Sequence, residues 1–157
     1  MIELKPAMRA GARRLAWLGL LCSLALAGCY SSDYGRQTAA TVSMLSDLAA
    51  KLGDYCRADF KLGGREVSSE EMGEFYYGLK KARSYASEAA SNSNRQSYRD
   101  LNGLIDDYAG LVSDADRYRL AGKSDSDQLK DLLARQLRVR MAAQTVIYDL
   151  RKEKQDG

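Results

Sequence analysis

Apolar residues recur at helical spacing in four blocks of this 157-residue chain, and almost nothing interrupts them. The blocks cover residues 42–56, 72–90, 101–118 and 129–150. The single proline, Pro6, precedes all four of them. Proline breaks a helix interior more strongly than any other residue, and no strand-like alternation of apolar and polar residues competes with the helical pattern. The sequence therefore predicts four amphipathic helices.

The breaks between the blocks are short and carry the signals of helix ends. Glycine, serine and asparagine dominate positions 63–64, 91–94 and 122–124. Two helix starts have the spacing of an N-terminal capping box: Ser68-x-x-Glu71 and the weaker Asp125-x-x-Gln128. Gly122 suits the left-handed conformation in which many helices end. Four helices of roughly 22–29 residues with short connections predict an all-α, up-down-up-down four-helix bundle.

The first 28 residues have the composition of an export signal. Four basic residues stand near the start: Lys5, Arg9, Arg13 and Arg14. An apolar run of 14 residues follows, from Leu15 to Gly28. Because a bilayer core needs about 20 helical residues, this run is too short for a comfortable membrane span. A basic start, a short apolar stretch and small residues at its exit are typical of a secretory signal peptide.

The run ends in Leu26-Ala27-Gly28-Cys29, which resembles the lipobox of bacterial lipoprotein precursors. The resemblance implies that signal peptidase II recognises Leu26, Ala27 and Gly28 and cuts before Cys29, whose thiol carries diacylglycerol and whose amino group is acylated. Tyr30 stands where an Asp tends to retain lipoproteins in the inner membrane. The resemblance therefore implies a lipid anchor in the outer membrane of a Gram-negative bacterium, on its periplasmic face. An ordinary cleaved signal with a chance Gly-Cys pair and an uncleaved anchor are the alternatives.

The chain divides accordingly into residues 1–28 as signal peptide, 29–35 as lipidated cysteine with a short tether, and 36–157 as the bundle. The six tether residues reach at most about 20 Å, which holds the bundle close to the membrane. Residues 1–28 contain four of the 24 Lys and Arg residues and one of the 21 Asp and Glu residues, so the mature chain has twenty of each sign. Nucleic-acid binding normally shows as a concentrated basic excess and is not expected here.

The residue types present limit the chemistry of this chain. It contains no histidine, which is the commonest general base and the commonest metal ligand. None of the usual signatures of nucleophilic, nucleotide-binding or zinc enzymes occurs. We therefore expect no catalytic residue, no metal site and no cofactor apart from the lipid on Cys29. Cys22 leaves with the signal, so Cys56 remains as a free thiol that is either a buried apolar residue or, less expected, part of an intermolecular disulfide.

Two arginines fall on the predicted apolar helix faces. On a helical projection, Arg83 lies near the centre of the apolar face of the second block, and Arg140 with Gln136 lies near that of the fourth. Both arginines come 15 residues after the predicted start of their helix, so they should lie at one height, near Asp107. A buried guanidinium needs a carboxylate or a bound anion. The expected role is structural, at the rim or paired with Asp107; the alternative is an anion or lipid-headgroup site.

The ten tyrosines form three groups. Four lie on apolar faces and are predicted to belong to the core: Tyr55, Tyr76, Tyr108 and Tyr118. Four lie off or beside those faces: Tyr77, Tyr85, Tyr98 and Tyr148. Tyr77 and Tyr85 lie about two turns apart on one side of the second block and form a candidate contact patch, because exposed tyrosines are enriched at interfaces. Tyr30 and Tyr34, which flank the lipidated cysteine, are expected at the level of the lipid headgroups.

Together these features predict a membrane-anchored lipoprotein that faces the periplasm and acts as a non-catalytic interaction or assembly module of the cell envelope. Its expected partners are membrane lipid, through acylated Cys29, and an envelope protein. The alternative is a carrier that binds a small anionic ligand or lipid headgroup near Arg83 and Arg140. An enzyme is the third class. No motif assigns the mature domain to a family.

Overall fold

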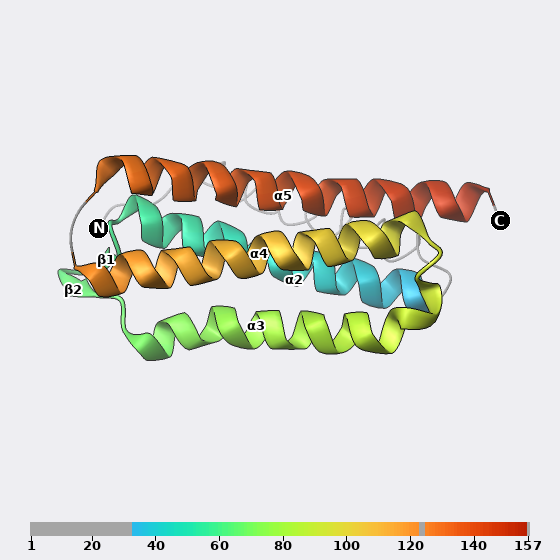
Figure 1. Ribbon diagram of the computed structural model, residues 1–157, viewed down its shortest axis with the longest axis horizontal. Helices are drawn as coiled ribbons and strands as arrows, with labels where there is room; N and C mark the ends of the chain where they lie inside the picture. The colour runs from blue at the N-terminus through green and yellow to red at the C-terminus, as the bar shows by residue number, and fades with distance from the viewer. Residues whose placement is uncertain (1–32, 123–124, 157) are drawn as a thin grey trace, which may run out of the picture.

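The computed structural model describes residues 33–122 and 125–156. The expectations for the signal peptide, the lipobox residues, Cys29 and Tyr30 lie outside these residues. Four long helices are joined by short connections (Figure 1): α2 (Asp33–Arg57), α3 (Ser69–Glu88), α4 (Gln96–Ala121) and α5 (Ser126–Gln155). Successive helices run in opposite directions. The predicted all-α, up-down-up-down four-helix bundle is confirmed.

The helices occupy the four corners of the bundle in chain order. Helix α5 packs against α2 and α4, and α3 packs against the same two, so α3 and α5 lie at opposite corners. One continuous apolar core runs between them. Its largest fully buried side chains come from the inner face of each helix and include Leu45, Phe75, Leu104, Tyr108 and Val139.

Cys56 lies in this core near the end of α2. Its side chain is 1% exposed, and burial raises the pKa of its thiol to about 12. A thiol in such surroundings stays protonated and packs as a small apolar group. The prediction of a buried cysteine is confirmed.

The helix ends predicted from the sequence are confirmed by their hydrogen bonds. The hydroxyl of Ser68 accepts from the backbone N–H of Glu71 (3.1 Å), and the Glu71 carboxylate accepts from the backbone N–H of Ser68 (2.8 Å). These two bonds complete the capping box of α3. Asp125 caps α5 by accepting from the backbone N–H of Asp127 (2.9 Å), but its own N–H donates to the hydroxyl of Tyr118 (3.1 Å), so the predicted capping box with Gln128 is only half formed. Gly122 ends α4 in the left-handed conformation, with φ +61°.

The connection between α2 and α3 contains a small hairpin that the sequence did not predict. Strand β1 (Lys61–Leu62) pairs antiparallel with β2 (Arg65–Glu66). Gly63 (φ +59°) and Gly64 (φ +83°) form the turn, and two successive positive φ angles are what a tight hairpin turn requires. With two residues in each strand, an alternation of apolar and polar residues has no room to show in the sequence.

Residues 33–35 were assigned to the tether, but they are helical and belong to α2 (Asp33–Arg57). Gly35 is buried and Tyr34 is half-buried. In the sequence, residues 30–32 lie between Cys29 and the first described residue of α2. None of the helices within residues 33–122 and 125–156 combines the length and the apolar character needed to cross a membrane.

Candidate functional site at the proximal end of the bundle

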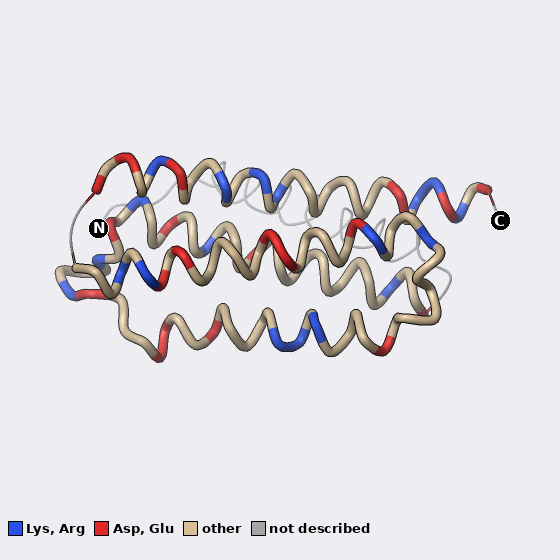
Figure 2. The backbone as a smooth tube through the Cα atoms, viewed as in Figure 1, with Lys and Arg blue, Asp and Glu red and all other residues tan. Residues whose placement is uncertain are grey.

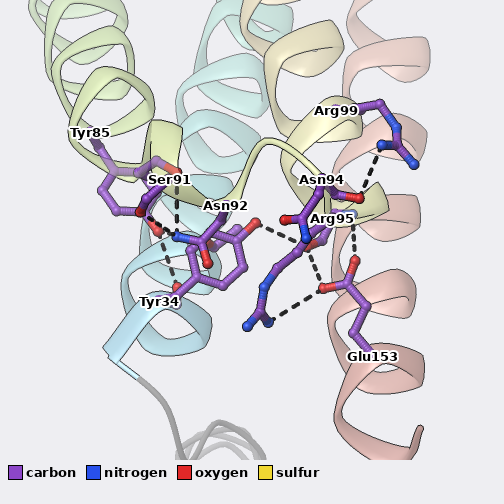
Figure 3. A network of polar contacts seen from close by, with 11 residues as sticks. Tyr34, Tyr85, Ser91, Asn92, Asn94, Arg95, Arg99 and Glu153 are labelled. Atoms are coloured by element: carbon purple, nitrogen blue, oxygen red, sulfur yellow. Dashed lines mark hydrogen bonds and ion pairs between the residues drawn. The ribbon is translucent and has the colours of Figure 1, made fainter. Parts of the chain in front are cut away.

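One end of the bundle gathers the start of α2, the end of α3, the start of α4 and the end of α5 (Figure 1). Because α2 starts close to Cys29 in the sequence, we call this the proximal end, and the opposite end, with the hairpin, the distal end. A short 3₁₀ turn, η1 (Ala89–Asn92), connects α3 to α4 there. Figure 3 shows polar side chains from all four helices meeting around this turn.

A carboxylate from α5 caps the N-terminus of α4. The residue that precedes α4, Arg95, provides no side-chain cap of its own. Instead, Glu153 in the last turn of α5 accepts hydrogen bonds from the backbone N–H of Ser97 (2.8 Å) and from its hydroxyl (2.7 Å). The Arg95 guanidinium completes the group at 3.8 Å from the same carboxylate. Free backbone N–H groups and the positive end of the helix dipole both favour a carboxylate at this position.

Tyr34 joins the first turn of α2 to this cap. Its hydroxyl is hydrogen-bonded to the hydroxyl of Ser97 (2.9 Å), and the Arg95 guanidinium lies 4.9 Å from the centre of its ring. Burial is the main cause that raises the pKa of Tyr34. Tyr34, which was expected at the level of the lipid headgroups, is therefore held in the bundle by a hydrogen bond between its hydroxyl and that of Ser97 and by a cation–π contact with Arg95.

Tyr85 makes the corresponding connection from α3. Its hydroxyl donates to the backbone carbonyl of Tyr34 (3.1 Å) and is hydrogen-bonded to the hydroxyl of Thr38 (2.6 Å). Thr38 is fully buried, and burial also raises the pKa of Tyr85. The first turn of α2 is thus fixed to α3 through Tyr85, to α4 through Ser97 and, through Glu153, to α5.

The turn between α3 and α4 is held by its own side chains (Figure 3). Asn92 donates to the carbonyl of Ala89 (3.3 Å), and Arg99 donates to the carbonyl of Asn94 (3.1 Å). This turn occupies the Ser- and Asn-rich break that the sequence predicted at residues 91–94. The break is therefore an ordered connection with satisfied backbone groups.

A carboxyl group beside this network has a raised pKa. The neighbouring side chain of Asp100 on α4 is the main cause that raises the pKa of Asp149 on α5 to about 6. Partial burial and the negative charges of Asp100 and Glu153 act in the same direction. The two carboxylates repel each other when both are ionised, so Asp149 retains its proton at mildly acidic pH.

The predicted placement of Arg83 and Arg140 near the centres of the apolar helix faces is wrong. Both side chains are exposed, on helices at opposite corners of the bundle, and Asp107 is exposed as well. The helical projection placed the centre of the buried face of α3 near Arg83, whereas the buried residues are centred on Ala82, the residue before it. In α5 the residue before Arg140, Val139, is buried instead. The arginines therefore do not converge on one anion site.

Gln136 is the member of that predicted set that is buried. It is 2% exposed and lies against Gly53 of α2, where an added Cβ would come within 3.1 Å of its side-chain carbonyl oxygen. A side chain at residue 53 would displace the amide, so the glycine provides the room for it. Within the described residues, the Gln136 side chain has no hydrogen bond to another group.

The predicted contact patch of Tyr77 and Tyr85 is not formed. Tyr77 is 63% exposed, with Lys81 placed over its ring, whereas Tyr85 is turned inward and bonded to α2. Among the predicted core tyrosines, Tyr76 is 41% exposed, and its hydroxyl donates to Asp116 (3.3 Å). The three others are buried as predicted: Tyr55, Tyr108 and Tyr118.

Among residues 33–122 and 125–156, two surface hollows lie at the distal end. The larger, of about 380 Å³, lies between α4 and α5, where Arg135 is paired with Asp114. The smaller, of about 190 Å³, lies beside the hairpin, where the hydroxyl of Tyr118 donates to Asp59 (2.7 Å). Within residues 33–122 and 125–156, no three His, Cys, Asp or Glu side chains are grouped so that they could hold a metal ion.

Comparison of the chain with protein-family models, with curated proteins and with solved structures gives no match. The interpretation of the site therefore depends on the chemistry of its own residues.

The proximal network was not predicted from the sequence, although one feature of the sequence points to it. Glu153 stands among Arg151, Lys152 and Lys154 in the last turn of the fourth predicted helix. A carboxylate at that position interacts unfavourably with the helix dipole unless another group binds it. An isolated acid there indicates a partner, but only the folded chain shows that the partner is the start of α4.

Proposed function

We propose that this chain is a lipid-anchored, non-catalytic interaction module of the bacterial cell envelope. The carrying observation is the position of α2, which starts four residues after the lipobox cysteine and is bonded in its first turn to α3 and α4. Four extended residues reach about 14 Å at most. A lipid on Cys29 would hold the proximal end at the membrane surface and direct the rest of the bundle into the periplasm.

The proximal network suits this role mechanically. A tether attached to a loosely packed helix end would unravel that end when it is pulled. Here a pull on residues 29–32 is passed from Tyr34 to three helices at once, through Tyr85, Ser97 and Glu153. Such a connection supports a protein whose task is to hold something at a fixed distance from the membrane.

A non-catalytic role is supported by the kind of side chains present. The chain has no histidine, and the groups with a strongly displaced pKa serve the fold: Cys56 and Tyr108 in the core, Glu71 in a capping box and Asp149 beside the proximal network. The two hollows contain none of these groups. Active sites usually bring displaced pKa values into a cleft. No observation favours the anion carrier, because Arg83 and Arg140 lie apart.

The anchor is tested by expressing the full precursor in a Gram-negative host with a fatty acid that carries an alkyne tag. We expect the wild-type protein to take up the tag and to fractionate with the outer membrane. Cys29→Ser should lose the tag and remain at precursor size, whereas Cys22→Ser, which changes the other cysteine of the signal, should behave as wild type. A Cys29→Ser protein that is still processed and tagged would overturn the proposal.

A further inference from the structure

Helix α5 carries a second apolar stripe on the face turned away from the bundle. It consists of Ala134, Leu137, Met141, Gln144 and Tyr148, all exposed, and we call it the outer seam. Its large apolar members are strongly exposed: Leu137 at 55%, Met141 at 67% and Tyr148 at 64%. Of the six large hydrophobic side chains that the described residues expose, three lie on this seam. Single exposed apolar residues are common on proteins, but an ordered row of them indicates an interaction surface.

The spacing of the outer seam is that of a helix–helix contact. Its members follow one another at intervals of three, four, three and four residues, which is the repeat of a coiled-coil seam. At 100° per residue, this row lies nearly opposite the buried row of α5, which contains Leu132, Val139, Val146 and Leu150. The inner row already accounts for the packing of α5 on the bundle, so the fold does not explain the outer row.

The charge beside the outer seam is positive. Arg138 and Arg140 lie on its two sides, both exposed, and neither has an ion pair with another described residue. No Asp or Glu occurs from residue 132 to 148. In Figure 2 this middle part of α5 has blue positions, which are arginines, and no red, acidic ones. The third arginine of this stretch, Arg135, is turned to Asp114 of α4.

This positive charge distinguishes between three possible occupants of the outer seam: a second copy of this chain, a lipid surface and a helix of another protein. A second copy of the same stretch, residues 132–148, would supply more arginines and no carboxylate to pair with them. An anionic lipid surface would match the charge, but Gln144 would then enter the hydrocarbon with an unpaired amide. A partner helix with an apolar stripe and acidic flanks matches the apolar row, the positive charge and Gln144. Its stripe packs on the row and its acidic flanks pair with the arginines. A polar residue of the partner can pair with Gln144 across the seam, as in coiled coils. We propose that the outer seam binds an acidic amphipathic helix of an envelope partner.

This inference rests on the proposed interaction role and gives its partner a chemistry. The test uses the full mature protein, purified from membranes in detergent, and two synthetic three-heptad peptides. Both peptides have leucine along the seam, with glutamate on the flanks of one and lysine on the flanks of the other. Binding is followed by fluorescence anisotropy at low and at high salt. We expect the glutamate peptide to bind at least about tenfold more tightly than the lysine peptide, with the difference reduced at high salt.

Matched variants locate the contact. Met141→Glu should weaken binding of the glutamate peptide at least about tenfold, whereas Leu120→Glu, at an equally exposed apolar residue of α4, should leave it unchanged. Arg140→Glu should reduce the preference for the glutamate peptide, and Arg83→Glu, at an exposed arginine of α3, should not. Because all four side chains are exposed, none of these changes disturbs the core.

Several results would overturn the outer-seam proposal. These are equal binding of the two peptides, no binding of either, or equal effects of Met141→Glu and Leu120→Glu. Self-association, or binding to anionic vesicles, that Met141→Glu alone abolishes would assign the seam to a second copy or to the membrane. The peptide experiment does not depend on Cys29 being lipidated, so a failed anchor and a failed seam are distinguishable.

Discussion

At the scale of single residues, Gln136 is the clearest departure from an apolar core. Its amide is buried against Gly53 without a hydrogen bond to any other described group. Burying an unpaired amide costs about 1–3 kcal/mol, and methionine has nearly the same length and flexibility. Gln136→Met should therefore raise the free energy of unfolding by about 1 kcal/mol, as measured by urea unfolding. Gln144→Met, at an exposed position of the same helix, is the control and should change little; a destabilised Gln136→Met protein would show that the amide is bound.

Asp149 gives the bundle a pH dependence whose sign follows from its raised pKa. The folded state holds the Asp149 proton up to about pH 6, whereas an unfolded aspartate releases it near pH 4. The folded state therefore binds more protons between these values, and its stability falls as the pH rises through that range. Above pH 6 the repulsion between Asp149 and Asp100 is fully present.

Asp149→Asn removes this repulsion. We expect the variant to be more stable than wild type at pH 7 by up to about 1 kcal/mol, the scale of partly exposed charge pairs, and equal to it at pH 4. Urea unfolding at several pH values measures the difference. Asp107→Asn, at an exposed aspartate of α4, should show no such pH-dependent gain. A gain from Asp149→Asn that stays constant with pH would contradict the raised pKa of Asp149.

At the scale of the elements, the start of α4 depends on a group from another helix. Glu153→Ala removes the cap of α4 and leaves the buried backbone N–H of Ser97 without its acceptor. Losing an N-terminal cap costs about 0.5–2 kcal/mol, and an unsatisfied buried donor places this case at the upper end. We expect a loss of about 2 kcal/mol in the free energy of unfolding and faster amide hydrogen exchange at the first turn of α4.

The control for this change is Asp47→Ala, at an exposed acid in the middle of α2 with no ion pair to another described residue. It should shift stability by no more than a few tenths of a kcal/mol. If amide exchange in Glu153→Ala accelerates throughout the bundle and not first at α4, the carboxylate stabilises the whole fold. Its role as a local cap would then be contradicted.

Helix boundaries could be predicted wherever a residue carries its own local signal. Ser68 and Gly122 act through bonds or backbone angles within a few residues, and both helix ends were placed correctly. The start of α2 was not, because Tyr34 is held by contacts with Ser97 and Tyr85, more than fifty residues away. Helix rotation failed for a related reason. A residue that follows a buried one is turned 100° from it, so only an error that is a large part of this angle places Arg83 and Arg140 in the core.

At the scale of the whole molecule, the periodicity of the sequence was sufficient to predict the architecture but not the site. Four amphipathic blocks with short breaks leave few other ways to bury their apolar faces. The proximal network joins residues from four separate helices, such as Tyr34, Ser97 and Glu153, and their meeting depends on how the helices pack. The outer seam of α5 was present in the sequence, but its apolar residues could be recognised as a separate surface only once the inner row was known.

The whole-molecule claim is that the bundle is attached to a membrane at its proximal end through Cys29. The intact mass of the protein purified from membranes, with fragmentation of its N-terminal peptide, tests this most directly. We expect a chain of residues 29–157 that carries a diacylglyceryl group on the Cys29 thiol and an acyl group on its amine. An unmodified thiol at Cys29, or a chain that begins at any other residue, would contradict the claim.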